Sequence, residues 1–168
     1  MALLRRLVDI LEAVVDLFGR LAAWTCVALV LLVAGSVLAR YFFRTGAMWL
    51  QELEWHLISP IALFGMSYAL LQGEQVRVDV LFERFPALVR RIIEIVTGLL
   101  LVIFAVWMVR LSIPFVMQSF RIGEGSPNPG GLPARFVLKG LVPLGFVLLA
   151  MQGLAHALRH AFLGPRSP

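Results

Sequence analysis

The sequence predicts an all-α integral membrane protein with four transmembrane helices and an amphipathic N-terminal helical extension, forming a single membrane domain over residues 1–168. Hydrophobic residues make up 60% of the chain and charged residues only 15%, whereas an ordinary soluble domain has about 45–50% apolar and about 25% charged residues. The apolar residues also stand in long uncharged runs, which are typical of helices that span a bilayer. So few charges cannot cover the surface of a soluble globule of this size.

The N-terminal segment 3–20 carries a polar stripe on an otherwise apolar helix. Its polar residues recur at spacings of three and four, so they share one helix face; they are Arg5, Asp9, Glu12, Asp16 and Arg20. The pairs Arg5–Asp9 and Asp16–Arg20 are four residues apart and can support each other. The pattern predicts an interfacial helix, or a helical extension of the first span, in contact with lipid or with another subunit.

Four apolar segments follow, and each approaches the roughly 20 residues that cross a bilayer once its amphipathic ends are included. The predicted spans are about 21–39, 53–73, 91–110 and 137–158. Pro86 and Pro133 fall where the third and fourth of these helices are expected to begin. The stretch RIGEGSPNPGGLP between the last two spans is rich in Gly and Pro, which predicts a turn segment.

Four spans place both chain termini on the same side of the membrane. The polar segments on that side contain more Arg and Lys than those on the other side, so the positive-inside rule predicts cytoplasmic N- and C-termini. The basic residues are spread over every polar segment and form no basic helix or aromatic-basic platform. They indicate contact with membrane lipid, and we expect no nucleic-acid partner.

The segment WLQELEWH at 49–56 places two tryptophans, two carboxylates and a histidine at the start of the second span. On a helix Glu52 and His56 share a face, whereas Glu54 lies on nearly the opposite side, so too few ligands converge for a metal site. Tryptophans are typical of the headgroup level, and carboxylates are stabilised at the N-terminal end of a helix. We therefore interpret Trp49, Glu52 and Glu54 as anchoring or interface residues and expect no metal.

Other polar residues give no readable catalytic or cofactor-binding arrangement. His156 and His160 are expected at the opposite end of the bundle from His56, so they cannot face it across a haem. Glu94 is the acid deepest in a predicted span, where an acid can mark an ion pathway, but we interpret it as an interfacial ion pair with Arg90. The sequence thus predicts a protein that is not an enzyme and has no cofactor.

Arg135 and Lys139 lie in the first turns of the fourth span, where the helix dipole disfavours cations. In the predicted topology this helix starts on the same side of the membrane as the second span. One hypothesis is that the two cations pair there with Glu52 and Glu54. Contact of the cations with lipid phosphates is an equal alternative.

Several stretches form an ordered set: ARYFF at 39–43, WLQELEWHL at 49–57, ALFGMSYAL at 62–70, VRVDVL at 76–81 and EGSPNPGGLPARFVLKGLVPLGFVLLAMQGLA at 124–155. Together they resemble the small membrane subunit (DctQ-type) of tripartite ATP-independent periplasmic (TRAP) transporters. The matching positions, none a known catalytic residue of that family, are Trp49, Glu52, Arg77, Asp79, Gly131, Pro133 and Lys139. Many members of the family have a histidine where this chain has Gln75.

The resemblance implies a set of partners and a location. A periplasmic substrate-binding protein would deliver an organic acid, and a large TRAP permease subunit would carry the substrate and sodium sites. The small subunit would scaffold the large one in the bacterial inner (cytoplasmic) membrane, as part of a symport system for organic acid uptake. The alternative functions are a stand-alone four-helix small exporter and a membrane anchor subunit of a redox complex.

Overall fold

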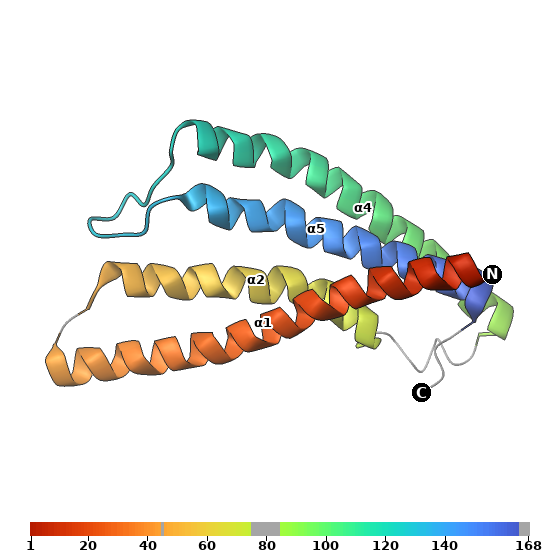
Figure 1. Cartoon of the computed structure of the whole chain (residues 1–168), viewed down its shortest axis with the longest axis horizontal. Coiled ribbons are helices and arrows are strands. Elements are labelled where there is room, and N and C mark those ends of the chain that lie inside the picture. Colours follow the sequence, from red (N-terminus) through yellow and green to blue (C-terminus); the bar gives the residue numbers. More distant parts are fainter. Residues whose placement is uncertain (45, 75–84, 165–168) are drawn as a thin grey trace.

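The computed structural model describes residues 1–44, 46–74 and 85–164. The described secondary structure consists of helices joined by connecting segments. The helices are α1 (Ala2–Phe43), α2 (Met48–Gln72), α4 (Ala87–Arg121) and α5 (Arg135–Leu158), and α5 continues into the π-helix η1 (Arg159–Leu163). Figure 1 shows α2 beside α1 and α5, and α4 packed along α5. The α1–α2 and α4–α5 connections lie at one end of the bundle, and the N-terminus and η1 lie at the other. The predicted interface residues Arg77 and Asp79 fall outside the described residues.

α1 is one continuous helix of 42 residues. At about 1.5 Å per residue it is about 63 Å long, roughly twice the thickness of a bilayer core. The predicted segment 3–20 and the predicted span 21–39 are therefore joined without a break. The polar stripe is not wholly exposed, however, because Glu12 is buried with Val8 and Val15 on the face toward the bundle. The Asp16–Arg20 ion pair is confirmed at 2.8 Å.

α4 is much longer than the predicted span 91–110. It begins at Ala87, directly after Pro86, and continues through Pro114 to Arg121. The charge of Arg110 ended the apolar run on which the prediction relied, but a charge does not interrupt backbone hydrogen bonding. Pro114 removes only one helical N–H, a loss that a membrane helix can tolerate when nearby hydroxyls or other helices compensate.

α5 follows the prediction closely, since it begins at Arg135 and ends at Leu158. Ala134, directly before it, has φ 62°, in the left-handed region. This residue and the neighbouring Pro133 turn the chain into the helix. After Leu158 the helix widens into the π-turn of η1. Such turns are rare in proteins, and those that occur are often found at functional sites.

Three of the described helices are long and apolar enough to cross a membrane: α1, α4, and α5 together with η1. α2 has 25 residues but is not in this group. Its first turns carry Glu52, Glu54 and His56, which lower its hydropathy. The prediction of a fourth span at 53–73 therefore stays a prediction.

Glycines lie at close contacts between the helices. Gly98 of α4 packs so tightly on α5 that an added Cβ would lie 2.8 Å from the Gly153 carbonyl oxygen and 2.9 Å from the Ala157 Cβ. Gly19 of α1 is likewise covered by the ring of Tyr68. Small residues at such positions let helix backbones pack closely in membranes. The Gly98 contact holds α4 and α5 together near the end of the bundle that carries η1.

Candidate functional site

Glu52 is buried beneath the segment that connects α4 to α5. Its residue is only 1% exposed. Its carboxylate accepts hydrogen bonds from the hydroxyl of Ser126, from Nδ2 of Asn128 at 3.1 Å and from the backbone N–H of Leu132 at 2.7 Å. Three donors around one carboxylate fix the position of the connecting segment over the start of α2.

The connecting segment is shaped to close over this carboxylate. The Ser126 N–H donates to the Leu132 carbonyl at 3.1 Å, and the Gly131 N–H donates to the Asn128 carbonyl at 3.0 Å. A Cβ at Gly131 would lie 2.7 Å from Oε2 of Glu52 and would also collide with Ser126. Gly131 is therefore the residue that allows the chain to pass so close to Glu52.

Lys139 forms its ion pair with Glu124, in the connecting segment, and not with Glu52 or Glu54. The backbone N–H of Arg135 also donates to the Glu124 carbonyl at 2.9 Å. The pairing of Arg135 with the two carboxylates stays a prediction, whereas the hypothesis that Lys139 pairs with them is wrong. The reason is that the segment 122–134 folds between the two helices and supplies its own partners to both.

Both loop-facing carboxylates have lowered pKa values. The Ser126 hydroxyl, followed by the Leu132 N–H, lowers the pKa of Glu52, which precedes the predicted span. The hydrogen bond from Lys139 is the main cause that lowers the pKa of Glu124. The nearby charge of Arg135 contributes to both shifts in the same direction. These carboxylates are thus held in the ionised form that accepts the surrounding hydrogen bonds.

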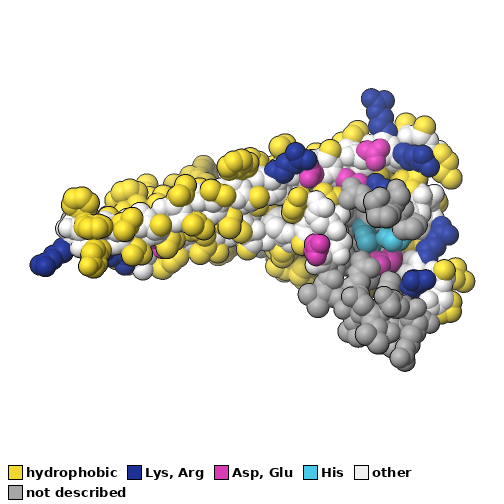
Figure 2. All heavy atoms as spheres, turned by 90° about the horizontal axis from the view of Figure 1, so that it is seen from below, with side chains coloured by type: hydrophobic (Ala, Val, Ile, Leu, Met, Phe, Trp, Pro, Cys, Tyr) yellow, Lys and Arg dark blue, Asp and Glu magenta, His cyan; other side chains and the backbone are white. Residues whose placement is uncertain are grey.

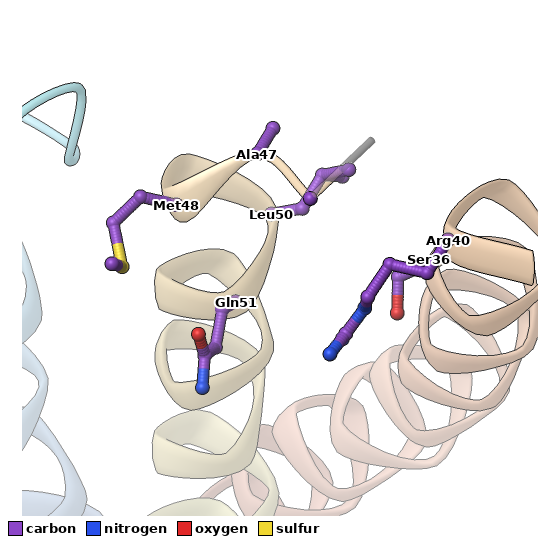
Figure 3. Close-up of a pocket in the computed structure, with 7 residues that line it drawn as sticks. Ser36, Arg40, Ala47, Met48, Leu50 and Gln51 are labelled. Carbon is purple, nitrogen blue, oxygen red and sulfur yellow. The ribbon is translucent and has the colours of Figure 1, made fainter. Parts of the chain in front are cut away.

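Glu54 faces away from this loop and toward α1, as its position on the helix predicts. It accepts a hydrogen bond from the Ser36 hydroxyl at 2.9 Å. Ser36 and Arg40 line one side of a hollow between the helices, and the first turns of α2 line the other (Figure 3). The side chain of Trp49 remains exposed, as expected for a residue at the headgroup level.

A second polar cluster lies at the opposite end of the bundle. Glu94 of α4 contacts His156 of α5, with 2.8 Å between Oε2 and Nε2. Both residues are buried. Glu94 thus has His156 as a partner, and the predicted pairing with Arg90 stays a prediction. His160 is one helical turn beyond His156, and the centroids of the two rings are 4.5 Å apart.

Two arginines form hydrogen bonds to the residues around this cluster. Arg159 donates two hydrogen bonds to the carboxylate of Glu12 in α1, from Nε at 2.9 Å and from Nη2 at 2.7 Å. The same Nη2 lies 3.7 Å from Oδ1 of Asp9. Asp9 therefore lies against Arg159, not in the predicted pair with Arg5. Arg91 donates to the carbonyls of His160 and Ala161. Figure 2 shows charged and histidine side chains gathered at this end, while the long remainder of that face is mainly apolar.

Sequence reasoning missed the Glu94–His156–His160 group. The four-residue spacing of the histidines was visible, because it places both on one helix face. What the sequence could not show is that α4 brings Glu94 against that face. The depth of Glu94 in its predicted span was the available signal, since acids inside spans are seldom without a specific partner.

Residues 29–163 match the family described as "Tripartite ATP-independent periplasmic transporters, DctQ component". The chain belongs to the DctQ family. A curated relative, the ectoine TRAP transporter small permease protein TeaB of Halomonas elongata, is 27% identical over 155 residues, covering 90% of this chain and 79% of TeaB. The resemblance identified from the sequence is thereby confirmed, and the family is a transporter component, not an enzyme family.

The DctQ match includes both polar clusters. Of the residues predicted from the resemblance, the structure brings Glu52 and Gly131 into direct proximity and places Pro133 two residues before Arg135, the first residue of α5. Lys139 lies on the first turns of α5, paired with the loop. Among the matched polar residues that the structure describes, Glu52 and Lys139 thus connect α2 and α5 to the α4–α5 segment.

Proposed function

We propose that this protein is the small permease subunit of a TRAP transporter, scaffolding a large permease subunit in sodium-driven, binding-protein-dependent uptake of an organic acid. The observation that carries the proposal is the DctQ match over residues 29–163. The partners are a large TRAP permease subunit and a periplasmic substrate-binding protein. The relative TeaB is the small permease protein of an ectoine transporter, and we propose organic acids as the substrate class for this system.

A scaffolding role is supported by polar contacts that join separate elements at both ends of the bundle. Glu52 joins α2 to the α4–α5 segment, and Arg159 joins η1 to α1. Both sets brace the ends of the bundle. Between them the outward faces of α1 and α4 are rich in exposed large apolar residues, which suit lipid or another membrane subunit.

We place the protein in the bacterial inner membrane with cytoplasmic termini, and we place α2 across the bilayer as the fourth span. The excess of Arg and Lys on the side of the termini supports this orientation. In it the first turns of α1 extend on the cytoplasmic side, Glu52 and the α4–α5 segment lie at the periplasmic side, and the Glu94–His156 pair lies toward the cytoplasm.

The contact with the large subunit is proposed at an exposed hollow on α4, lined by Val102, Ile103, Val106, Trp107, Arg110 and Leu111. Trp107 is 66% exposed and offers a large apolar surface. Arg110 is exposed beside it. A cation facing lipid tails is costly, so a carboxylate of a partner subunit would stabilise this surface more than lipid would.

Co-expression with a large TRAP permease subunit, the partner proposed for this chain, tests the proposal. We expect the two chains to copurify, and sodium-dependent uptake in proteoliposomes to require both chains and the loaded binding protein. Trp107→Ala should reduce the recovered large subunit, while Trp24→Ala, at a tryptophan of α1 that is also largely exposed, should not. Transport by this chain alone would instead support an independent exporter and contradict the proposal.

A further inference from the structure

Glu94, His156 and His160 form a compact group of potential metal ligands from two helices. One ligand atom of each, a carboxylate oxygen or an imidazole nitrogen, lies within 4.8 Å of the other two. Glu94 and His156 are buried, and His160 is half-buried at the edge of the group. This arrangement belongs to neither the proposed subunit interface nor the Glu52 cluster.

The ligand types and their spacing match a known mode of metal binding. Two histidines four residues apart on one helix face, completed by a carboxylate from another segment, make a His₂Glu set that suits Zn²⁺. With metal–ligand bonds of about 2.0–2.1 Å, tetrahedral geometry places ligand atoms about 3.3 Å apart. On metal binding, the 2.8 Å between Oε2 of Glu94 and Nε2 of His156 would increase slightly, and the His160 imidazole would move toward them.

Hydrogen bonds from two arginines fix the turn at the end of α5 and the start of η1, where both histidines lie. Arg91 of α4 donates to the carbonyls of His160 and Ala161, and so fixes the π-turn from one side. Arg159 fixes the same turn from the α1 side through its paired bonds to Glu12. The guanidinium groups of Arg91 and Arg159 thus both have oxygen partners, which reduces their repulsion of a cation at the histidines.

We propose that Glu94, His156 and His160 bind one divalent transition-metal ion, Zn²⁺ in preference to Mg²⁺, as a structural clip between α4 and the α5–η1 turn. Imidazole ligands favour Zn²⁺, whereas Mg²⁺ prefers oxygen ligands. The fourth coordination position is taken by water. The clip strengthens the end of the bundle on which α1 also converges, and it does not depend on the proposed transport function.

The test uses the full chain, purified in detergent without a histidine tag and treated with a chelator. Co²⁺ is titrated first, because its visible absorption bands report tetrahedral coordination, and Zn²⁺ is then added as a competitor. We expect one Co²⁺ per chain, displacement by Zn²⁺, and a higher melting temperature with Zn²⁺ but not with Mg²⁺. A folded wild-type chain that gives no tetrahedral bands and no Zn²⁺-dependent stabilisation would overturn the proposal.

Variants identify the ligands. His160→Ala should weaken Zn²⁺ binding by at least about tenfold, and its position at the half-buried edge of the group favours a folded variant. Glu94→Gln, which keeps the size of the side chain, should do the same. The matched control is His56→Ala at the other end of the bundle, which should leave Zn²⁺ binding unchanged. Equal losses in His56→Ala and His160→Ala would contradict the assignment.

Discussion

Gly131 and Glu52 are distant in the sequence but touch in the structure, where a Cβ on Gly131 would lie 2.7 Å from the Glu52 carboxylate. The carboxylate is in turn the common acceptor for Ser126, Asn128 and the Leu132 N–H. The start of α2 and the α4–α5 segment therefore pack as one unit. This packing requires that residue 131 has no side chain and that Glu52 carries a carboxylate.

Gly131→Ala should destabilise the protein by about 1–3 kcal/mol, because the added methyl group overpacks the contact between the loop and Glu52. Thermal unfolding in detergent measures the change. Gly125→Ala is the matched control in the same segment, since a Cβ there meets no atom within 4 Å. Similar melting temperatures for the two variants would mean that the loop does not pack on Glu52 as described.

Acidification should loosen the α4–α5 segment. Because the pKa values of Glu52 and Glu124 are lowered in the folded protein, their contribution is complete above the ordinary glutamate pKa of 4.5. It is lost as the pH falls below that value through the lower folded pKa. Melting temperatures measured from about pH 6 down to about pH 3 should fall, and Glu52→Gln or Glu124→Gln should flatten the profile.

The matched control for this pH profile is Glu74→Gln, at an exposed carboxylate just after α2. It should keep the steep wild-type decline. If Glu74→Gln flattened the profile as much as Glu52→Gln, the acid sensitivity would not arise from the carboxylates of the loop.

Arg159→Ala should destabilise the protein by about 3 kcal/mol, because it leaves the buried Glu12 carboxylate without its bidentate partner. Arg20→Ala removes the exposed i, i+4 pair with Asp16 and should cost only about 0.5 kcal/mol. The free energy of unfolding is measured chemically or thermally for Arg159→Ala and for Arg20→Ala, each with and without Glu12→Gln. Glu12→Gln should reduce the further effect of Arg159→Ala and not that of Arg20→Ala.

Gly98→Ala should separate α4 from α5, since its methyl group would meet the Gly153 carbonyl and Ala157. We expect a loss of about 1–3 kcal/mol in stability. Gly140→Ala serves as the control on α5, where a Cβ meets nothing within 4 Å and helix propensity favours alanine by up to about 1 kcal/mol. Disulfide trapping between cysteines placed on α4 and α5 would report directly on the helix separation.

The sequence predicted the elements and missed several partners. Apolar runs indicated α1, α4 and α5, because burial in lipid depends on local composition alone. The apolar run at 91–110 did not show that the helix continues to Arg121, since the charge of Arg110 ended the apolar pattern but not the helix. The separate orientations of Glu52 and Glu54 followed from helical periodicity, whereas their true partners, the loop and Ser36, did not.

The sequence by itself determined the class of the protein, its helices and its resemblance to the DctQ family, because hydropathy and ordered motifs are properties of the linear chain. Tertiary structure alone decided that Glu52 accepts its bonds from the loop, that Lys139 pairs with Glu124, and that Glu94 meets His156. These contacts join residues on separate elements. Only the close packing of the helices and the path of the connecting segment set such distances, and neither leaves a periodic signal in the sequence.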